Sequence, residues 1–123
     1  MNSGRTLGIA GILLALAMVL GAFGAHGLKA QLSLDQLQVY ETAVLYHFLN
    51  ALGLLGVGLT LRFANVPAVR WAAVLILIGI VLFSGSLYVL TFGAPHPIGI
   101  VTPFGGLALI AGWICFAAGV WRS

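Results

Sequence analysis

The sequence predicts an all-α integral membrane protein, a four-helix bundle that crosses the bilayer four times. Hydrophobic residues make up 62% of the 123 residues and charged residues only 6%, with a mean hydropathy of +1.17. A soluble domain is typically about 25% charged, because its surface faces water. Most of this surface must therefore face lipid. Four apolar stretches separated by short polar connections fill the chain, and we expect one membrane domain over residues 1–123.

The small number of charges excludes several classes of partner. The formal charge of +3 comes from five basic and two acidic residues, which is too few for the basic patch that nucleic-acid binding requires. The single cysteine, Cys115, allows no intrachain disulfide and no cysteine-based zinc site. The lipid bilayer is the partner that this composition predicts.

The first predicted span covers residues 7–25, about 19 residues without a charge and about 28 Å long as a helix. Arg5 and the Ala22-Phe23-Gly24 triplet also fit a cleaved signal peptide. The apolar run is longer than a signal peptide usually has, and three more spans follow, so we favour a span. Small residues recur near one helical face, where a neighbouring backbone approaches closely. They are Gly4, Gly8, Gly11, Ala15, Ala22 and Ala25.

Residues 26–39 interrupt the apolar pattern with polar side chains. Ser33 and Gln36 have the spacing of a capping box, which marks the start of a helix. Interspersed leucines give the segment an apolar side. We therefore expect a short helix on the membrane surface between the first and second spans.

The remaining predicted spans cover residues 40–61, 71–92 and 102–121. Counting back about 20 residues from Leu61 places Glu41 at the membrane interface and His47 and Asn50 inside. Thr102 followed by Pro103 is typical of a helix N-cap and first helical position. In the fourth span Gly105, Gly112 and Gly119 repeat every seven residues and predict a packing face.

The basic residues predict the orientation. With four spans, Arg5, Arg62, Arg70 and Arg122 lie on one side of the membrane, and Lys29 lies on the other. Because basic residues concentrate in cytoplasmic segments, both termini are expected in the cytoplasm.

The second span carries the polar residues of most interest. Tyr40, His47 and Asn50 lie within about 80° of one another on a helical wheel, whereas Glu41 lies about 120° from His47. The third span has a polar face at i, i+4 and i+7 that supplies expected partners. Its members are Ser84, Tyr88 and Thr91.

Three blocks together are distinctive: residues 21–28 (GAFGAHGL), residues 40–43 (YETA), and residues 98–106 (IGIVTPFGG) continuing to Gly112-Trp113. In this order they resemble the YgdD-type family of small bacterial inner-membrane proteins, which has eukaryotic transmembrane relatives. The resemblance implies a multi-pass protein of the bacterial inner (plasma) membrane without an established activity, and it supplies no catalytic residue. The family pattern leads us to expect a second histidine where this chain has Asn50.

Three hypotheses for the polar cluster remain open. In the first, its side chains hold helices together in a structural or accessory protein, which joins a homo-oligomer or a larger membrane complex through its glycine faces. In the second, His47 and Asn50 serve a small oligomeric transporter or channel. In the third, His26, His47 and His96 form an extracytoplasmic metal site together with Glu41. No Ser/His/Asp arrangement and no His-Glu-x-x-His motif is present, so we expect neither an enzyme nor a cofactor.

Overall fold

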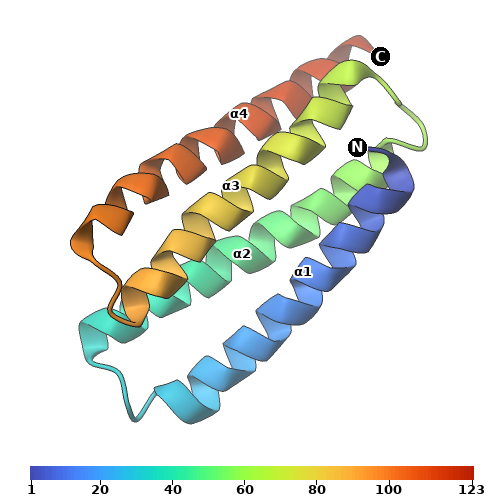
Figure 1. Cartoon of the computed structure of the whole chain (residues 1–123). Helices are drawn as coiled ribbons and strands as arrows, with labels where there is room; N and C mark the ends of the chain where they lie inside the picture. Colours follow the sequence, from blue (N-terminus) through green and yellow to red (C-terminus); the bar gives the residue numbers. More distant parts are fainter.

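A computed structural model describes all residues from Met1 to Ser123 and contains four long α-helices and no strand (Figure 1). Helix α1 spans Ser3–Phe23 and is continued by the π-helical turn η1, Gly24–Leu28. The other helices are α2 (Leu34–Thr60), α3 (Pro67–Thr91) and α4 (Val101–Arg122), with the 3₁₀-helix η2 (His96–Ile100) leading directly into α4.

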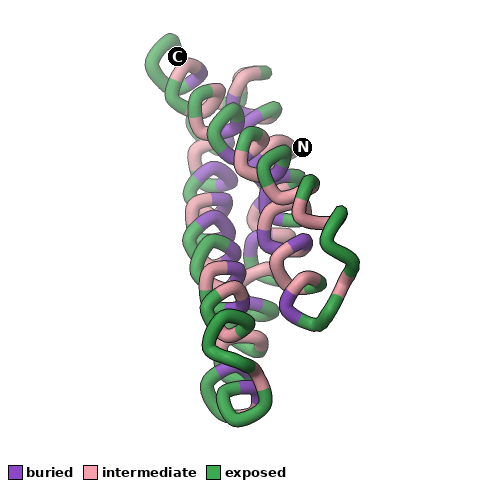
Figure 2. The backbone as a smooth tube through the Cα atoms, turned by 90° about the vertical axis from the view of Figure 1, so that its left-hand side faces the viewer, coloured by how far each residue is buried: buried purple, intermediate pink, exposed green.

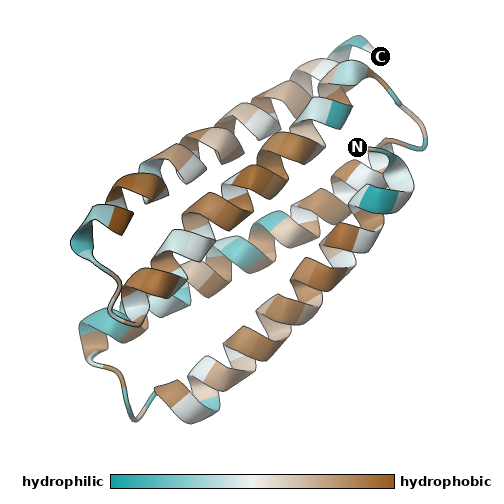
Figure 3. Ribbon diagram, in the orientation of Figure 1, coloured by the Kyte–Doolittle hydropathy of each residue, from teal (hydrophilic) through white to brown (hydrophobic).

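Each of the four helices is long and apolar enough to cross a membrane. Hydrophobic residues run along the middle of every helix, and most of the hydrophilic ones gather at helix ends and connections (Figure 3). The fold is therefore an all-helical bundle with four candidate membrane spans, as the sequence predicts. Each helix begins before its predicted span, because the predicted spans count only the apolar part of each helix.

The helix starts follow local capping chemistry. The Asn2 side chain accepts a 2.8 Å hydrogen bond from the Arg5 amide at the start of α1. Ser33 and Gln36 form the predicted capping box, in which each side chain binds the other residue's amide. Thr102, however, is not the N-cap of α4, because the helix already begins at Val101 after η2.

The connection between α1 and α2 differs from the expected surface helix. Residues 24–28 continue α1 as a π-helical turn, a short turn follows, and the capping box starts α2 at Leu34. The segment is thus divided between the ends of two long helices, and no separate helix forms.

Each helix packs against the next one in the chain, and α1 and α4 form the two outer members of the arrangement (Figure 1). Buried residues lie where the helices face one another, and the outer faces are exposed (Figure 2). Nine buried hydrophobic residues form a core between the four helices. They are Ala10, Leu54, Val57, Leu61, Val69, Ala73, Ile76, Ile80 and Leu109.

Helix α1 has small residues on two opposite faces. The face that packs against the other helices is not the one that the predicted stripe of small residues occupies. Thr6, Ala10 and Ala17 are buried. Gly8, Gly11 and Ala15 are exposed, and a Cβ atom at Gly8 or Gly11 would meet nothing within 4 Å. Within this chain Gly8, Gly11 and Ala15 of the predicted stripe therefore lie on an open face of α1.

Helix α4 contacts α3 through its glycines. A Cβ atom at Gly105 would lie 2.7 Å from the Phe83 Cα, and one at Gly112 would lie 3.1 Å from the Ile76 backbone nitrogen. One at Gly119 would lie 3.2 Å from the Val69 nitrogen. The three contacts follow one another every seven residues on both helices, so α3 and α4 run antiparallel with their backbones close together.

Candidate functional site

His47 lies at the centre of a junction between three helices. Only 4% of its surface is exposed. Its Nε2 lies 2.9 Å from the carbonyl oxygen of Leu13 on α1, and its Nδ1 lies 2.8 Å from the hydroxyl oxygen of Tyr88 on α3. A carbonyl only accepts hydrogen bonds, so Nε2 carries the proton, and Nδ1 of the neutral ring accepts from the Tyr88 hydroxyl. The imidazole therefore joins α1, α2 and α3 with both of its nitrogens.

Tyr40 forms a second junction one heptad away. Its hydroxyl donates to the carbonyl oxygen of Leu20 on α1, and its ring packs against that of Tyr88 at a centroid distance of 5.7 Å. Gly24 leaves room for this ring, because a Cβ atom there would lie 2.5 Å from the Tyr40 Cε1. Tyr40 and His47 thus bond to two α1 carbonyls that are also seven residues apart, as antiparallel helices in regular contact require.

Asn50 connects α2 to α4. Its amide nitrogen donates to the carbonyl oxygen of Tyr46 on its own helix at 2.8 Å, and its Oδ1 accepts from the indole nitrogen of Trp113 at 3.0 Å. The sequence analysis expected its partner on the third span instead. Trp113 was not among the candidate residues. Its position in the middle of an apolar helix was the available signal, because a buried indole N–H usually has a hydrogen-bond partner.

The three polar residues predicted on the third span differ in what they contact. The Ser84 hydroxyl donates to the carbonyl oxygen of Ala43 on α2 at 2.9 Å. Tyr88 bonds to His47, as described above. The Thr91 hydroxyl donates at 2.8 Å to Leu87 of its own helix, and only the Thr91 carbonyl reaches α2, where it accepts from Gln36 at 3.3 Å. Two of the three side chains therefore hold α2 and α3 together.

Other bonds between helices involve residues that the sequence analysis did not select. The Ser3 hydroxyl donates to the carbonyl oxygen of Gly58 at 2.7 Å and links α1 to α2. The hydroxyl oxygens of Ser86 and Thr102 lie 2.5 Å apart and link α3 to α4. Backbone carbonyls accept several of the bonds between helices, and no sequence pattern marks them, because every residue has one.

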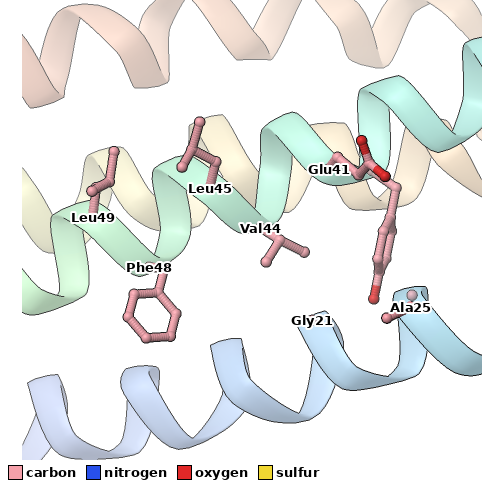
Figure 4. Close-up of a pocket in the computed structure, with 9 residues that line it drawn as sticks. Gly21, Ala25, Glu41, Val44, Leu45, Phe48 and Leu49 are labelled. Carbon is pink, nitrogen blue, oxygen red and sulfur yellow. The ribbon is translucent and has the colours of Figure 1, made fainter.

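The histidines of the metal hypothesis do not come together. His26 is exposed in the middle of η1 and His96 is exposed at the start of η2, whereas His47 faces the interior with both ring nitrogens bonded. The chain has no group of three His, Cys, Asp or Glu side chains placed to hold a metal ion. Glu41 is also exposed, on a different face of α2 from His47, next to a groove between α1 and α2 (Figure 4).

The cluster on α2 is a connected set of hydrogen bonds. Every buried side-chain nitrogen and oxygen in the chain has a partner. Through Tyr40, His47 and Asn50, helix α2 is bonded to each of the other three helices. The chemistry that this arrangement provides is the joining of helices by polar groups within an apolar bundle.

Four long apolar helices joined in this way define a multi-pass α-helical membrane protein. The family model described as "Protein of unknown function (DUF423)" matches residues 20–106. The chain belongs to this family, whose curated members carry the name UPF0382 membrane protein.

Several bacterial relatives match most of the chain. The UPF0382 membrane protein YwdK of Bacillus subtilis (strain 168) is 47% identical over 100 residues, covering 80% of this chain and 81% of the relative. The protein SSP2132 of Staphylococcus saprophyticus is 42% identical over 107 residues, covering 87% and 88%. The UPF0382 inner membrane protein YgdD of Escherichia coli (strain K12) is 33% identical over 105 residues, covering 85% and 80%. No solved structure matches the chain.

Proposed function

We propose that this protein is a structural or accessory component of the bacterial inner membrane, in which the polar cluster of α2 holds the helices together. One observation carries the proposal: His47 is 4% exposed and uses both ring nitrogens to bond Leu13 and Tyr88. Hydrogen bonds between membrane helices contribute about 0.6 to 2 kcal/mol each. The contribution of this ring to helix packing is therefore sufficient to explain a histidine at this position.

The geometry favours packing over transport. A proton carrier or solute ligand needs a nitrogen that its cargo can reach, and both nitrogens of His47 are occupied within the protein. Asn50 likewise has its oxygen bonded to Trp113 and its nitrogen bonded to Tyr46. Transport through these residues would have to break contacts between helices at each cycle.

Substituting His47 separates the packing role from a chemical one. A glutamine at this position keeps one donor for the Leu13 carbonyl and one acceptor for the Tyr88 hydroxyl, but it neither titrates nor replaces imidazole as a metal ligand. We expect His47→Gln to retain most of the stability and to complement a deletion phenotype, and His47→Leu to lose both. A stable His47→Gln protein that fails to complement would contradict the proposal.

The orientation follows from the arginines, which gather at one end of the bundle. Arg5 lies near the start of α1, Arg62 and Arg70 flank the connection from α2 to α3, and Arg122 ends α4. The positive-inside rule places this end and both termini in the cytoplasm. A reporter that is active only in the periplasm should be inactive when fused after Ser123. Strong activity of that fusion would show the opposite orientation, with the C-terminus in the periplasm.

The outer face of α1 is the surface that an accessory role would use. Gly8, Gly11 and Ala15 leave it shallow and unoccupied within the chain, and small residues let a second helix approach closely. A second copy of this chain, or a larger complex, would pack there. Energy transfer between labelled copies in vesicles should fall for Gly11→Leu and remain for Gly56→Leu, a substitution at another open position. Equal transfer in both variants would exclude self-association through this face.

A further inference from the structure

A groove lies between the C-terminal part of α1 with η1 and the N-terminal part of α2. Figure 4 shows Val44 and Phe48 pointing from α2 toward α1, with Glu41, Leu45 and Leu49 on the adjoining side of α2. The hollow has a volume of about 360 Å³ and is mostly apolar. This size falls within the range of about 300 to 1,000 Å³ that is usual for small-molecule sites.

Small residues of α1 and η1 create the groove. Gly21 of α1 and Gly24 and Ala25 of η1 form the wall opposite α2. A Cβ atom at Gly21 would lie 3.5 Å from the nearest Val44 carbon, in ordinary van der Waals contact. A larger side chain at position 21 would therefore extend into the space between the helices.

A second hollow adjoins the first through Glu41. It has a volume of about 260 Å³ and is lined by Asp35, Gln38 and Glu41 together with two leucines. Asp35 and Glu41 are the only acidic residues of the chain. No lysine, arginine or histidine lines either hollow. An apolar groove thus meets a negatively charged hollow at a single carboxylate.

Helix capping explains only one of the two acidic residues. Asp35 lies in the first turn of α2, where a carboxylate interacts favourably with the helix dipole. That effect is confined to the first turn, and Glu41 lies beyond it. Glu41 shares one face of α2 with Leu45 and Phe48, at the i, i+4 and i+7 positions, so its carboxylate heads the column of apolar side chains that lines the groove.

We propose that the two hollows together bind a membrane amphiphile with a net positive head, such as an alkylammonium. Its tail lies in the groove between α1 and α2, and its ammonium group lies at Glu41 and Asp35. A phosphate-containing head fits less well, because both carboxylates would repel it and no basic side chain lines either hollow. This site is separate from the hydrogen bonds of His47, and the proposal stands independently of the packing role.

Electron paramagnetic resonance in phosphatidylcholine vesicles tests the proposal. The full-length protein is reconstituted, and the motionally restricted fraction is measured for three chain-labelled probes: an alkylammonium, a phosphatidylethanolamine and a phosphatidylcholine. We expect the alkylammonium to be selected over phosphatidylcholine by about two- to fivefold, the range of an exposed ion pair. Glu41→Gln should lower this preference toward one, because it removes the carboxylate where the two hollows meet and keeps the side-chain size.

Two further variants test the tail. Gly21→Leu fills the groove and should also abolish the preference, whereas Gly56→Leu adds the same side chain at an open position of α2 outside the groove and should leave it intact. Circular dichroism and gel filtration establish that each variant is folded. Since Glu41 is exposed, Glu41→Gln decides the result if Gly21→Leu does not fold. Selection that Glu41→Gln leaves undiminished, or equal selection of phosphatidylethanolamine and alkylammonium, would overturn the proposal.

Discussion

Helices α1 and α4 are the two outer helices of the bundle. Helix α1 is joined to α2 by three hydrogen bonds, whereas α4 is joined to α3 by one and approaches it mainly through glycines. Along α1, side chains of Ser3, Tyr40 and His47 bond to backbone carbonyls across the interface with α2. Along α4, Gly105, Gly112 and Gly119 let its backbone lie directly against α3. A hydrogen bond can be lost one at a time at modest cost, whereas a filled glycine contact separates the two backbones. The two interfaces should therefore respond very differently to substitution.

The largest effect is expected for Gly105→Leu. The new side chain would overlap backbone atoms of Phe83 and Leu82, which cannot rotate away as a side chain can. Overpacking typically costs about 1 to 3 kcal/mol, and we expect this variant at or above the upper end. The free energy of unfolding in mixed micelles with increasing dodecyl sulfate measures it. A smaller loss of unfolding free energy for Gly105→Leu than for His47→Leu would show that α4 is held to α3 mainly by other contacts.

His47→Leu should have the next largest effect. It removes the bonds to Leu13 and Tyr88 while keeping an apolar side chain of similar size, and each bond contributes about 0.6 to 2 kcal/mol. The double-mutant cycle with Tyr88→Phe isolates the contact between the two side chains and should give a coupling of about 0.6 to 1.7 kcal/mol. Additive losses in that cycle would mean that the two groups stabilise the fold separately.

Trp113→Phe should cost less, because it removes one hydrogen bond and retains an aromatic ring. We expect a loss of about 0.6 kcal/mol, and the same loss should disappear when Asn50 is already leucine. The comparison of Trp113→Phe in the two backgrounds, again by unfolding in mixed micelles, measures this. An unchanged loss in the Asn50→Leu background would place the partner of the indole elsewhere.

Gly8→Ala should not destabilise the bundle. A methyl group there meets nothing within 4 Å, and alanine favours a helix interior over glycine by about 0.5 to 1 kcal/mol. Thermal unfolding of the purified protein should show equal or greater stability. Ala10→Leu, on the buried face of α1, provides the matched contrast and should destabilise.

The sequence predicted the number of helices and their approximate limits, because four apolar stretches of this length have few alternatives in a chain with so little charge. It did not predict the rotation of α1. Small residues occupy both the face containing Gly8 and Gly11 and the opposite face containing Ala10 and Ala17, and only packing against α2 distinguishes them.

The candidate cluster was predictable in part for a related reason. Polar side chains in an apolar helix are conspicuous, so Tyr40, His47, Asn50, Ser84 and Tyr88 could be selected from their types and spacing. Their partners could not, because three of the acceptors are the backbone carbonyls of Leu13, Leu20 and Ala43. Such partners depend on the register between helices, which requires the three-dimensional structure.

The geometry of the junction requires His47 to join helices as a neutral ring enclosed by protein. Solid-state ¹⁵N nuclear magnetic resonance of histidine-labelled protein in lipid bilayers tests it directly, with the exposed His26 and His96 as internal references. We expect His47 in the Nε2-protonated tautomer, with an Nδ1 signal that shifts in Tyr88→Phe and no magnetisation transfer from water. An imidazolium or an Nδ1-protonated ring, or strong transfer from water to His47, would show that His47 is not the neutral, enclosed ring that joins the helices.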